Sequence, residues 1–110
     1  MARTKNFALV VIGLCAVLKQ CPAGWILGKQ LLRSGTSIGA NYREAQRART
    51  KTEFRSKIHI CQQEIEETIY WIELIHEADI GPAAMCQETL AEIQQLRAIF
   101  ISIGRKAIDD

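Results

Sequence analysis

The chain has 110 residues, the length of one small domain, and we predict a single domain over residues 1–110. Its content of 48% hydrophobic and 24% charged residues is ordinary for a globular protein and, with only 2 prolines, excludes a disordered or collagen-like chain. A formal net charge of +2 is too small to indicate nucleic-acid binding by itself, so the distribution of charge matters more than its total.

The first predicted helix carries an apolar stripe with spacings of 4, 3 and 4 residues and ends before Pro22. The stripe consists of Phe7, Val11, Leu14 and Leu18. Two basic residues followed by 12 apolar ones resemble the start of a secretory signal peptide. However, this apolar run is too short for a bilayer, and no small-residue cleavage site follows it. We therefore expect a cytoplasmic protein that makes no membrane contact.

The cysteines agree with that compartment. The 4 cysteines form no CxxC pair, and three of them lie in apolar stretches that read as helix. They are Cys15, Cys21, Cys61 and Cys86. We expect reduced, mostly buried thiols, with a disulfide or a bound metal as the less favoured alternative.

A second helix is predicted from about Trp25, with apolar or small residues spaced 4, 4, 3, 4 and 3 apart. These are Leu27, Leu31, Gly35, Ile38, Tyr42 and Ala45. The segment SGTSIGAN within it lacks both the GK[ST] of a P-loop and the G-x-G-x-x-G spacing, so a phosphate cradle is excluded. Because an internal glycine costs a helix about 1 kcal/mol relative to alanine, we predict that Gly35 and Gly39 permit close helix packing, within the chain or between subunits. A kinked helix is the alternative.

The third helix has the clearest pattern, a heptad seam with spacings of 4, 3, 4, 3, 4 and 3 residues. The seam consists of Phe54, Ile58, Cys61, Ile65, Thr68, Ile72 and Ile75. Thr50 and Glu53 fit a capping box at its start, and Gly81 followed by Pro82 ends it.

The fourth helix repeats the seam at Ile93, Leu96, Phe100, Ile103 and Ala107. A second stripe, at Leu90, Ile101 and Ile108, predicts a wide buried face. The three connections, at 20–24, 47–50 and 79–82, are short, so consecutive helices should run antiparallel. The predicted fold is all-α, an antiparallel up-down-up-down four-helix bundle.

Catalytic and metal-binding patterns find little support. Glu73 and His76 match the Glu-x-x-His of di-iron bundles, but such a site needs two of these motifs and two further glutamates, and only one motif is present. No Ser-His-Asp, Cys-His or paired-carboxylate arrangement is apparent, and Cys61 lies on the core seam. We predict no catalytic residue, no metal and no cofactor, and hence no enzyme.

Charge is distributed unevenly along the third helix. Six of the 14 Lys and Arg residues lie between 43 and 57, and none lies between 58 and 96. The helix is therefore basic at its start and acidic at its end, opposite to what the helix dipole favours, which indicates a functional surface.

Two partners fit this charge pattern. In the first reading, nucleic-acid phosphates contact the basic residues Arg43, Arg47, Arg49, Lys51, Arg55 and Lys57. In the second, those residues pair with acidic residues of a neighbouring subunit, namely Glu64, Glu67, Glu73, Glu77 and Asp79. A solvated surface without a partner is the third alternative.

Residues 29–74 resemble the central signature of the four-helix-bundle family first noticed as proteins encoded in intervening sequences of 23S ribosomal RNA genes. The pattern is Q-[LI]-x-R-[SA]-x-x-S-[IV]-x-x-N-x-x-E-[AG], a basic link, [ST]-x-x-[ED]-F, and a helix containing E-x-x-E-[TL]. The matching residues are Gln30, Leu31, Arg33, Ser34, Ser37, Ile38, Asn41, Glu44, Ala45, Thr50, Glu53, Phe54, Glu64, Glu67 and Thr68.

The resemblance implies an all-helical protomer that assembles with copies of itself into a homopentameric ring. Relatives include the accessory variability proteins of diversity-generating retroelements, which bind nucleic acid through a basic surface and contact a reverse transcriptase. The implied function is a non-catalytic nucleic-acid-binding or adaptor protein with RNA or DNA, and a reverse transcriptase, as partners. The alternative is a purely structural oligomer or protein-interaction module.

This chain departs from the family's pattern in two places. The first helix is unusually apolar, which predicts that it is more deeply buried than in relatives. The link after Ala48 lacks the common glycine, which leaves the shape of that link open.

Overall fold

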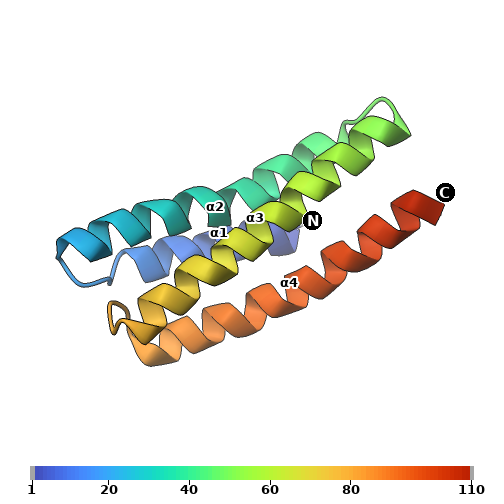
Figure 1. The fold of residues 1–110 in the computed structure, drawn as a ribbon. Helices are drawn as coiled ribbons and strands as arrows, with labels where there is room; N and C mark the ends of the chain where they lie inside the picture. The colour runs from blue at the N-terminus through green and yellow to red at the C-terminus, as the bar shows by residue number, and fades with distance from the viewer. Residues whose placement is uncertain (1, 110) are drawn as a thin grey trace.

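The computed structural model describes residues 2–109 and folds them into four α-helices, with no strand in this range. The helices are α1 (Ala2–Cys15), α2 (Pro22–Gln46), α3 (Lys51–Glu77) and α4 (Ala83–Asp109). Figure 1 shows an elongated body in which helices consecutive in the chain lie side by side, with overall extents of 46 × 20 × 19 Å. The predicted all-α class is therefore confirmed.

Side-chain caps set the starts of the two central helices. The Thr50 hydroxyl accepts a hydrogen bond from the Glu53 amide at 3.0 Å, and the Glu53 carboxylate accepts one from the Arg49 amide at 3.2 Å. The predicted cap at Thr50 is thus confirmed. By contrast, α2 begins at Pro22 rather than near Trp25, because the Cys21 sulfur accepts the Gly24 amide at 3.4 Å. Pro22 then occupies the first helical position, where a missing N–H costs nothing.

The loops at the other end of the molecule are tied to each other. The α1 helix ends at Cys15, earlier than predicted, yet Leu18 in the following turn is still buried. The Lys19 amide then donates to the Ile80 carbonyl oxygen at 2.8 Å, joining the α1–α2 loop to the α3–α4 loop. Asp79 turns the chain out of α3 with a φ of 57°, a conformation that aspartate tolerates better than most residues.

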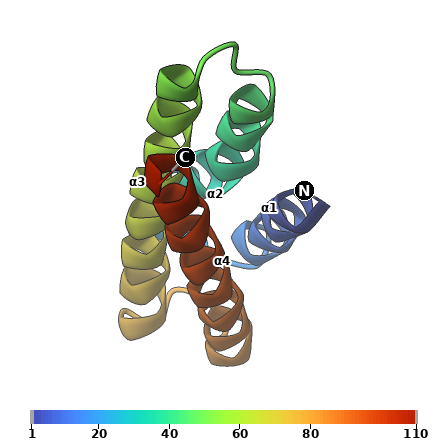
Figure 2. The ribbon, with the colours of Figure 1, turned by 90° about the vertical axis from the view of Figure 1, so that its right-hand side faces the viewer.

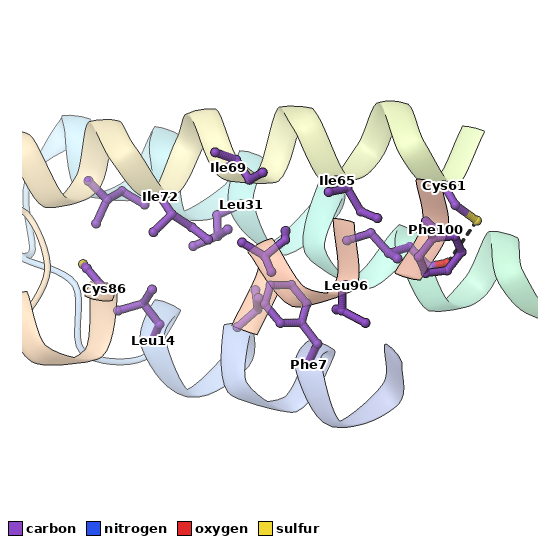
Figure 3. Close-up of a cluster of buried hydrophobic side chains, with 14 of the residues drawn as sticks. Phe7, Leu14, Leu31, Cys61, Ile65, Ile69, Ile72, Cys86, Leu96 and Phe100 are labelled. Atoms are coloured by element: carbon purple, nitrogen blue, oxygen red, sulfur yellow. Dashed lines mark hydrogen bonds between the residues drawn. The ribbon is translucent and has the colours of Figure 1, made fainter. Parts of the chain in front are cut away.

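The core runs along the predicted seams (Figure 3), where side chains from all four helices converge. The α3 seam is buried from Ile58 to Ile75, and Phe54 at its start is half-buried. The second stripe of α4 is wrong at Ile101 and Ile108, which are 40% and 73% exposed, whereas Leu90 is half-buried against the core. The α4 helix packs only against α3 and α1, so one seam is enough to cover its inner face.

The first helix is also less buried than predicted. It packs against α2 and α4 without its backbone approaching α3, and Figure 2 shows it set apart from α3. One face carries the buried stripe, while Leu9, Val10, Ile12 and Val17 remain exposed. The expectation of a deeply buried first helix is therefore wrong for the single chain. No helix in the described range is both long and apolar enough to cross a membrane.

The two glycines of the segment SGTSIGAN face α1 of the same chain. A Cβ atom built on Gly35 would lie 2.9 Å from Val11 Cγ2, and one built on Gly39 would lie 3.3 Å from Thr4 Oγ1. The α2 helix runs without interruption through both positions, so the glycines do not break it. Their small size therefore allows α1 and α2 to approach closely.

This close approach predicts opposite effects for two glycine-to-alanine changes. Gly13→Ala, where a new Cβ meets nothing within 4 Å, should raise the free energy of unfolding by about 1 kcal/mol through helix propensity. Gly35→Ala gains the same propensity but must displace Val11, so it should be less stable than Gly13→Ala by about 1–3 kcal/mol. Urea unfolding followed by circular dichroism measures both. Equal stability of the two variants would contradict the packing of α1 on Gly35.

Candidate nucleic-acid interface

Basic side chains gather where the α2–α3 loop and the C-terminal end of α4 meet, at the end of the molecule marked C in Figure 1. Seven exposed basic residues come together there from three helices and the loop. They are Arg43 in α2, Arg47 and Arg49 in the loop, Lys51 and Arg55 in α3, and Arg105 and Lys106 in α4. We call this group the basic end.

The structure adds Arg105 and Lys106 to the residues predicted from the sequence. Lys106 lines a cavity of about 520 Å³ together with Arg49 and Lys51, and the apolar side chains of Phe54 and Ile103 also line it. The sequence could have indicated these two residues, because an antiparallel fourth helix of this length must end beside the start of the third helix. They lie about 50 residues away in the chain and so do not belong to the local run of basic residues from 43 to 57.

Lys57 differs from the other predicted phosphate contacts. Its ammonium group lies 3.0 Å from the Glu44 carboxylate, so it joins α3 to α2 within the chain, and its side chain is only 30% exposed. The remaining predicted residues, from Arg43 to Arg55, have exposed side chains.

The predicted acidic residues fall into two groups. Glu64 and Glu67 both pair with Arg33 of the same chain, Glu64 at 3.3 Å, so they join α3 to α2. The other group, Glu73, Glu77 and Asp79, is exposed and forms no ion pair with another described residue. The structure therefore brings Glu64 and Glu67 to an intrachain contact and leaves the second group facing outward, far from the basic end.

The residues that carry the family resemblance lie on the contact between α2 and α3. The hydroxyl oxygens of Ser34 and Thr68 are 2.8 Å apart, and both side chains are fully buried. The guanidinium group of Arg33 bridges Glu64 and Glu67 beside them. Much of the signature thus specifies how two helices pair rather than a reactive centre.

The residues considered for catalysis or metal binding from the sequence are Cys61, Glu73 and His76. Burial raises the pKa of the Cys61 thiol to about 12, so it stays protonated near neutral pH and is a poor nucleophile. Glu73 is exposed, while His76 is half-buried with an unpartnered Nδ1. Within residues 2–109 no three His, Cys, Asp or Glu side chains are grouped so that they can hold a metal ion.

These features define a small all-helical protein whose candidate site is a charged surface rather than an enclosed pocket. The sequence profile of the 23S rRNA-intervening sequence protein family matches residues 1–102. The chain belongs to this family, which confirms the resemblance seen in the signature.

A solved structure supports the same assignment. The chain is similar to a crystal structure of a protein of unknown function from the S23 ribosomal protein family of Bacteroides thetaiotaomicron VPI-5482, with 32% sequence identity and a TM-score of 0.87. The match covers 94% of this chain and 95% of that one. A comparison with curated protein sequences found no significant match. The family description names no enzymatic activity.

The buried hydroxyl pair predicts a measurable loss of stability in Thr68→Val. The valine keeps the shape but leaves the Ser34 hydroxyl with only the Leu31 carbonyl at 3.4 Å, so unfolding should become easier by about 1–3 kcal/mol. Thr36→Val is the matched control, because the Thr36 hydroxyl bonds only carbonyls of its own helix and is only partly buried. Adding Ser34→Ala to Thr68→Val should cost less than the sum of the single changes. Thermal unfolding in which Thr68→Val matches Thr36→Val would refute the role of the pair.

Proposed function

We propose that the chain is a non-catalytic nucleic-acid-binding or adaptor protein that acts as a homo-oligomer. Its protomer is an antiparallel up-down-up-down four-helix bundle, and the assembly implied by the sequence resemblance is a homopentameric ring. The basic end is the surface that contacts nucleic acid.

The convergence of three helices and a loop at the basic end carries this proposal. Seven exposed cations from segments distant in the chain share one end of a body only about 20 Å wide. Like charges placed close together repel one another, so such a group is favoured where a polyanion neutralises it. Glu44 and Glu53 are acids in the adjoining helices, and they already bind Lys57 and the Arg49 amide.

The chemistry of binding is charge neutralisation with release of counterions, which is indifferent to base sequence. The cavity at this end adds a second element, because Phe54 and Ile103 offer apolar surface next to Arg49 and Lys106. An unstacked base lies well on an aromatic surface while its phosphates meet the cations. Single-stranded RNA is therefore the first probe, and the mention of 23S rRNA in the family description makes a fragment of that RNA a natural choice.

A second function, a structural oligomer or protein-interaction module without nucleic acid, is favoured by the exposed apolar side chains of α1 and α2. A reverse transcriptase is the protein partner implied by the sequence resemblance. In an adaptor, both functions operate together, because the basic end and the apolar surface lie on different parts of the chain.

The proposal predicts that one arginine at the basic end matters and an equally charged arginine elsewhere does not. Arg49→Ala should weaken binding of labelled single-stranded RNA and lower the slope of log affinity against log salt by about 0.7, the value for one lost phosphate contact on a single strand. Arg97→Ala is the matched control, since Arg97 is exposed in the middle of α4 and pairs with Glu66. Fluorescence anisotropy from about 50 to 200 mM salt measures both slopes.

Two results would contradict nucleic-acid binding at the basic end. The first is no binding of RNA or DNA by the wild type at low salt, and the second is equal slopes for the two variants. Light scattering on each variant checks that oligomer size, and hence avidity, is unchanged.

A further inference from the structure

The exposed half of α1 is the least expected surface of this molecule. Between Asn6 and Leu18 the helix and the turn after it carry no charged residue, and Leu9, Ile12 and Val17 are about half exposed. A helix that is apolar on all sides is normally buried on all sides. In the single chain only one side is covered, so the free side lacks a partner.

The neighbouring part of α2 extends this surface. Trp25 is 60% exposed, and together with Lys29 and Leu32 it lines a groove of about 330 Å³ against the end of α1. A second groove of about 580 Å³ continues along the same border between Ala8 and Ala40. Ile12 lies between the two grooves, one turn from both Ala8 and Cys15. We call the surface formed by the two grooves and Ile12 the α1–α2 face.

The charge of the α1–α2 face has one sign. The one acid in the sequence of α1 and α2 is Glu44, and it pairs with Lys57 of α3, so no acid of these two helices offsets the lysines on this face. They are Lys5, Lys19 and Lys29, and all three are exposed. The face therefore fits a partner that combines apolar contact with negative charge.

The same chain carries a surface of that kind on α3. Tyr70, Glu73 and Glu77 lie at intervals of three and four residues, on one side of the helix. Tyr70 is 54% exposed, both glutamates are exposed, and the chain has no Lys or Arg from residue 58 to 96. We call these three residues the α3 stripe. Figure 2 shows α3 and α1 on opposite sides of the molecule.

We propose that the α1–α2 face of one copy of the chain binds the α3 stripe of a second copy. The inference rests on the oligomer in the proposed function and names the two surfaces that form it. Complementary charge favours the pairing, and Trp25, Leu32 and Tyr70 supply apolar contact at its centre.

The arrangement also decides between two kinds of interface. A twofold contact of the α1–α2 face with itself would bring lysines against lysines with no acid to offset them. A contact between two different faces on opposite sides of the protomer is head-to-tail, and it repeats from copy to copy until a ring closes. Of the basic end only Arg43, which lines the groove between Ala8 and Ala40, borders this contact, and the other six basic residues stay available for a polyanion.

A charge-swap experiment tests the pairing in the full-length chain. Lys19→Glu/Lys29→Glu and Glu73→Lys/Glu77→Lys should each raise the dissociation constant of the oligomer about tenfold or more, as measured by light scattering over a dilution series. The chain carrying all four changes should regain the wild-type mass, because the positive charges and the negative charges have exchanged sides of the contact. All four residues are exposed, so circular dichroism melting curves should stay close to wild type.

A second pair of variants tests the apolar part of the contact. Ile12→Asp should dissociate the oligomer, whereas Ile108→Asp, at an exposed isoleucine of α4 outside both surfaces, should leave its mass unchanged. An oligomer that persists in both charge-reversed variants would overturn the pairing while leaving the oligomer of the proposed function intact. A monomeric wild type would overturn both the pairing and the oligomer of the proposed function. If that monomer binds phosphatidylserine vesicles through Lys29, the α1–α2 face is a lipid surface instead.

Discussion

The contact between α2 and α3 is the constraint on which the rest of this molecule depends. At its centre two hydroxyl groups, of Ser34 and Thr68, bond each other away from water, and the guanidinium of Arg33 reaches two carboxylates of α3 beside them. A buried polar pair has few alternative partners, so it fixes the register of the two helices more strictly than leucine and isoleucine packing does. Once that register is set, the short loop of residues 47–50 is enough to join the end of α2 to the start of α3.

The same register explains why the charges are segregated. Because the loop is short, the arginines at the end of α2 and the start of α3 must share one end of the body, and α4, packed along α3, brings Arg105 and Lys106 to it. The helix dipole of α3 opposes this placement by a few tenths of a kcal/mol for each charge. That cost is small beside the free energy of the core, so the fold tolerates a basic end that local stability does not favour.

What the sequence predicted and what it missed differ by the range of the interactions involved. The α3 seam and the Thr50 cap were predictable because each depends on residues within two helical turns. The cap at Cys21 escaped because sulfur is a weak acceptor and cysteine is not a usual capping residue. The exposed positions of Ile101 and Ile108 escaped because an apolar side chain does not reveal whether its partner lies in the same chain or in another. Lys57 escaped for a similar reason, since its pairing with Glu44 depends on the register of two helices.

The charge anomaly of α3 admitted two explanations that competed for the same basic residues, and the pairing that we propose draws its lysines from the α1–α2 face instead. Arg33 and Lys57 are already engaged between α2 and α3, whereas the lysines available to a neighbouring subunit lie on the α1–α2 face rather than in the loop. In the head-to-tail ring that we propose, the protomers would stand side by side with their long axes alongside one another, so every basic end would lie on the same rim. A polyanion that meets one loop then meets its neighbours at high effective concentration. Assembly and nucleic-acid binding would therefore reinforce each other, because a weak phosphate site on each subunit becomes a strong one on the rim.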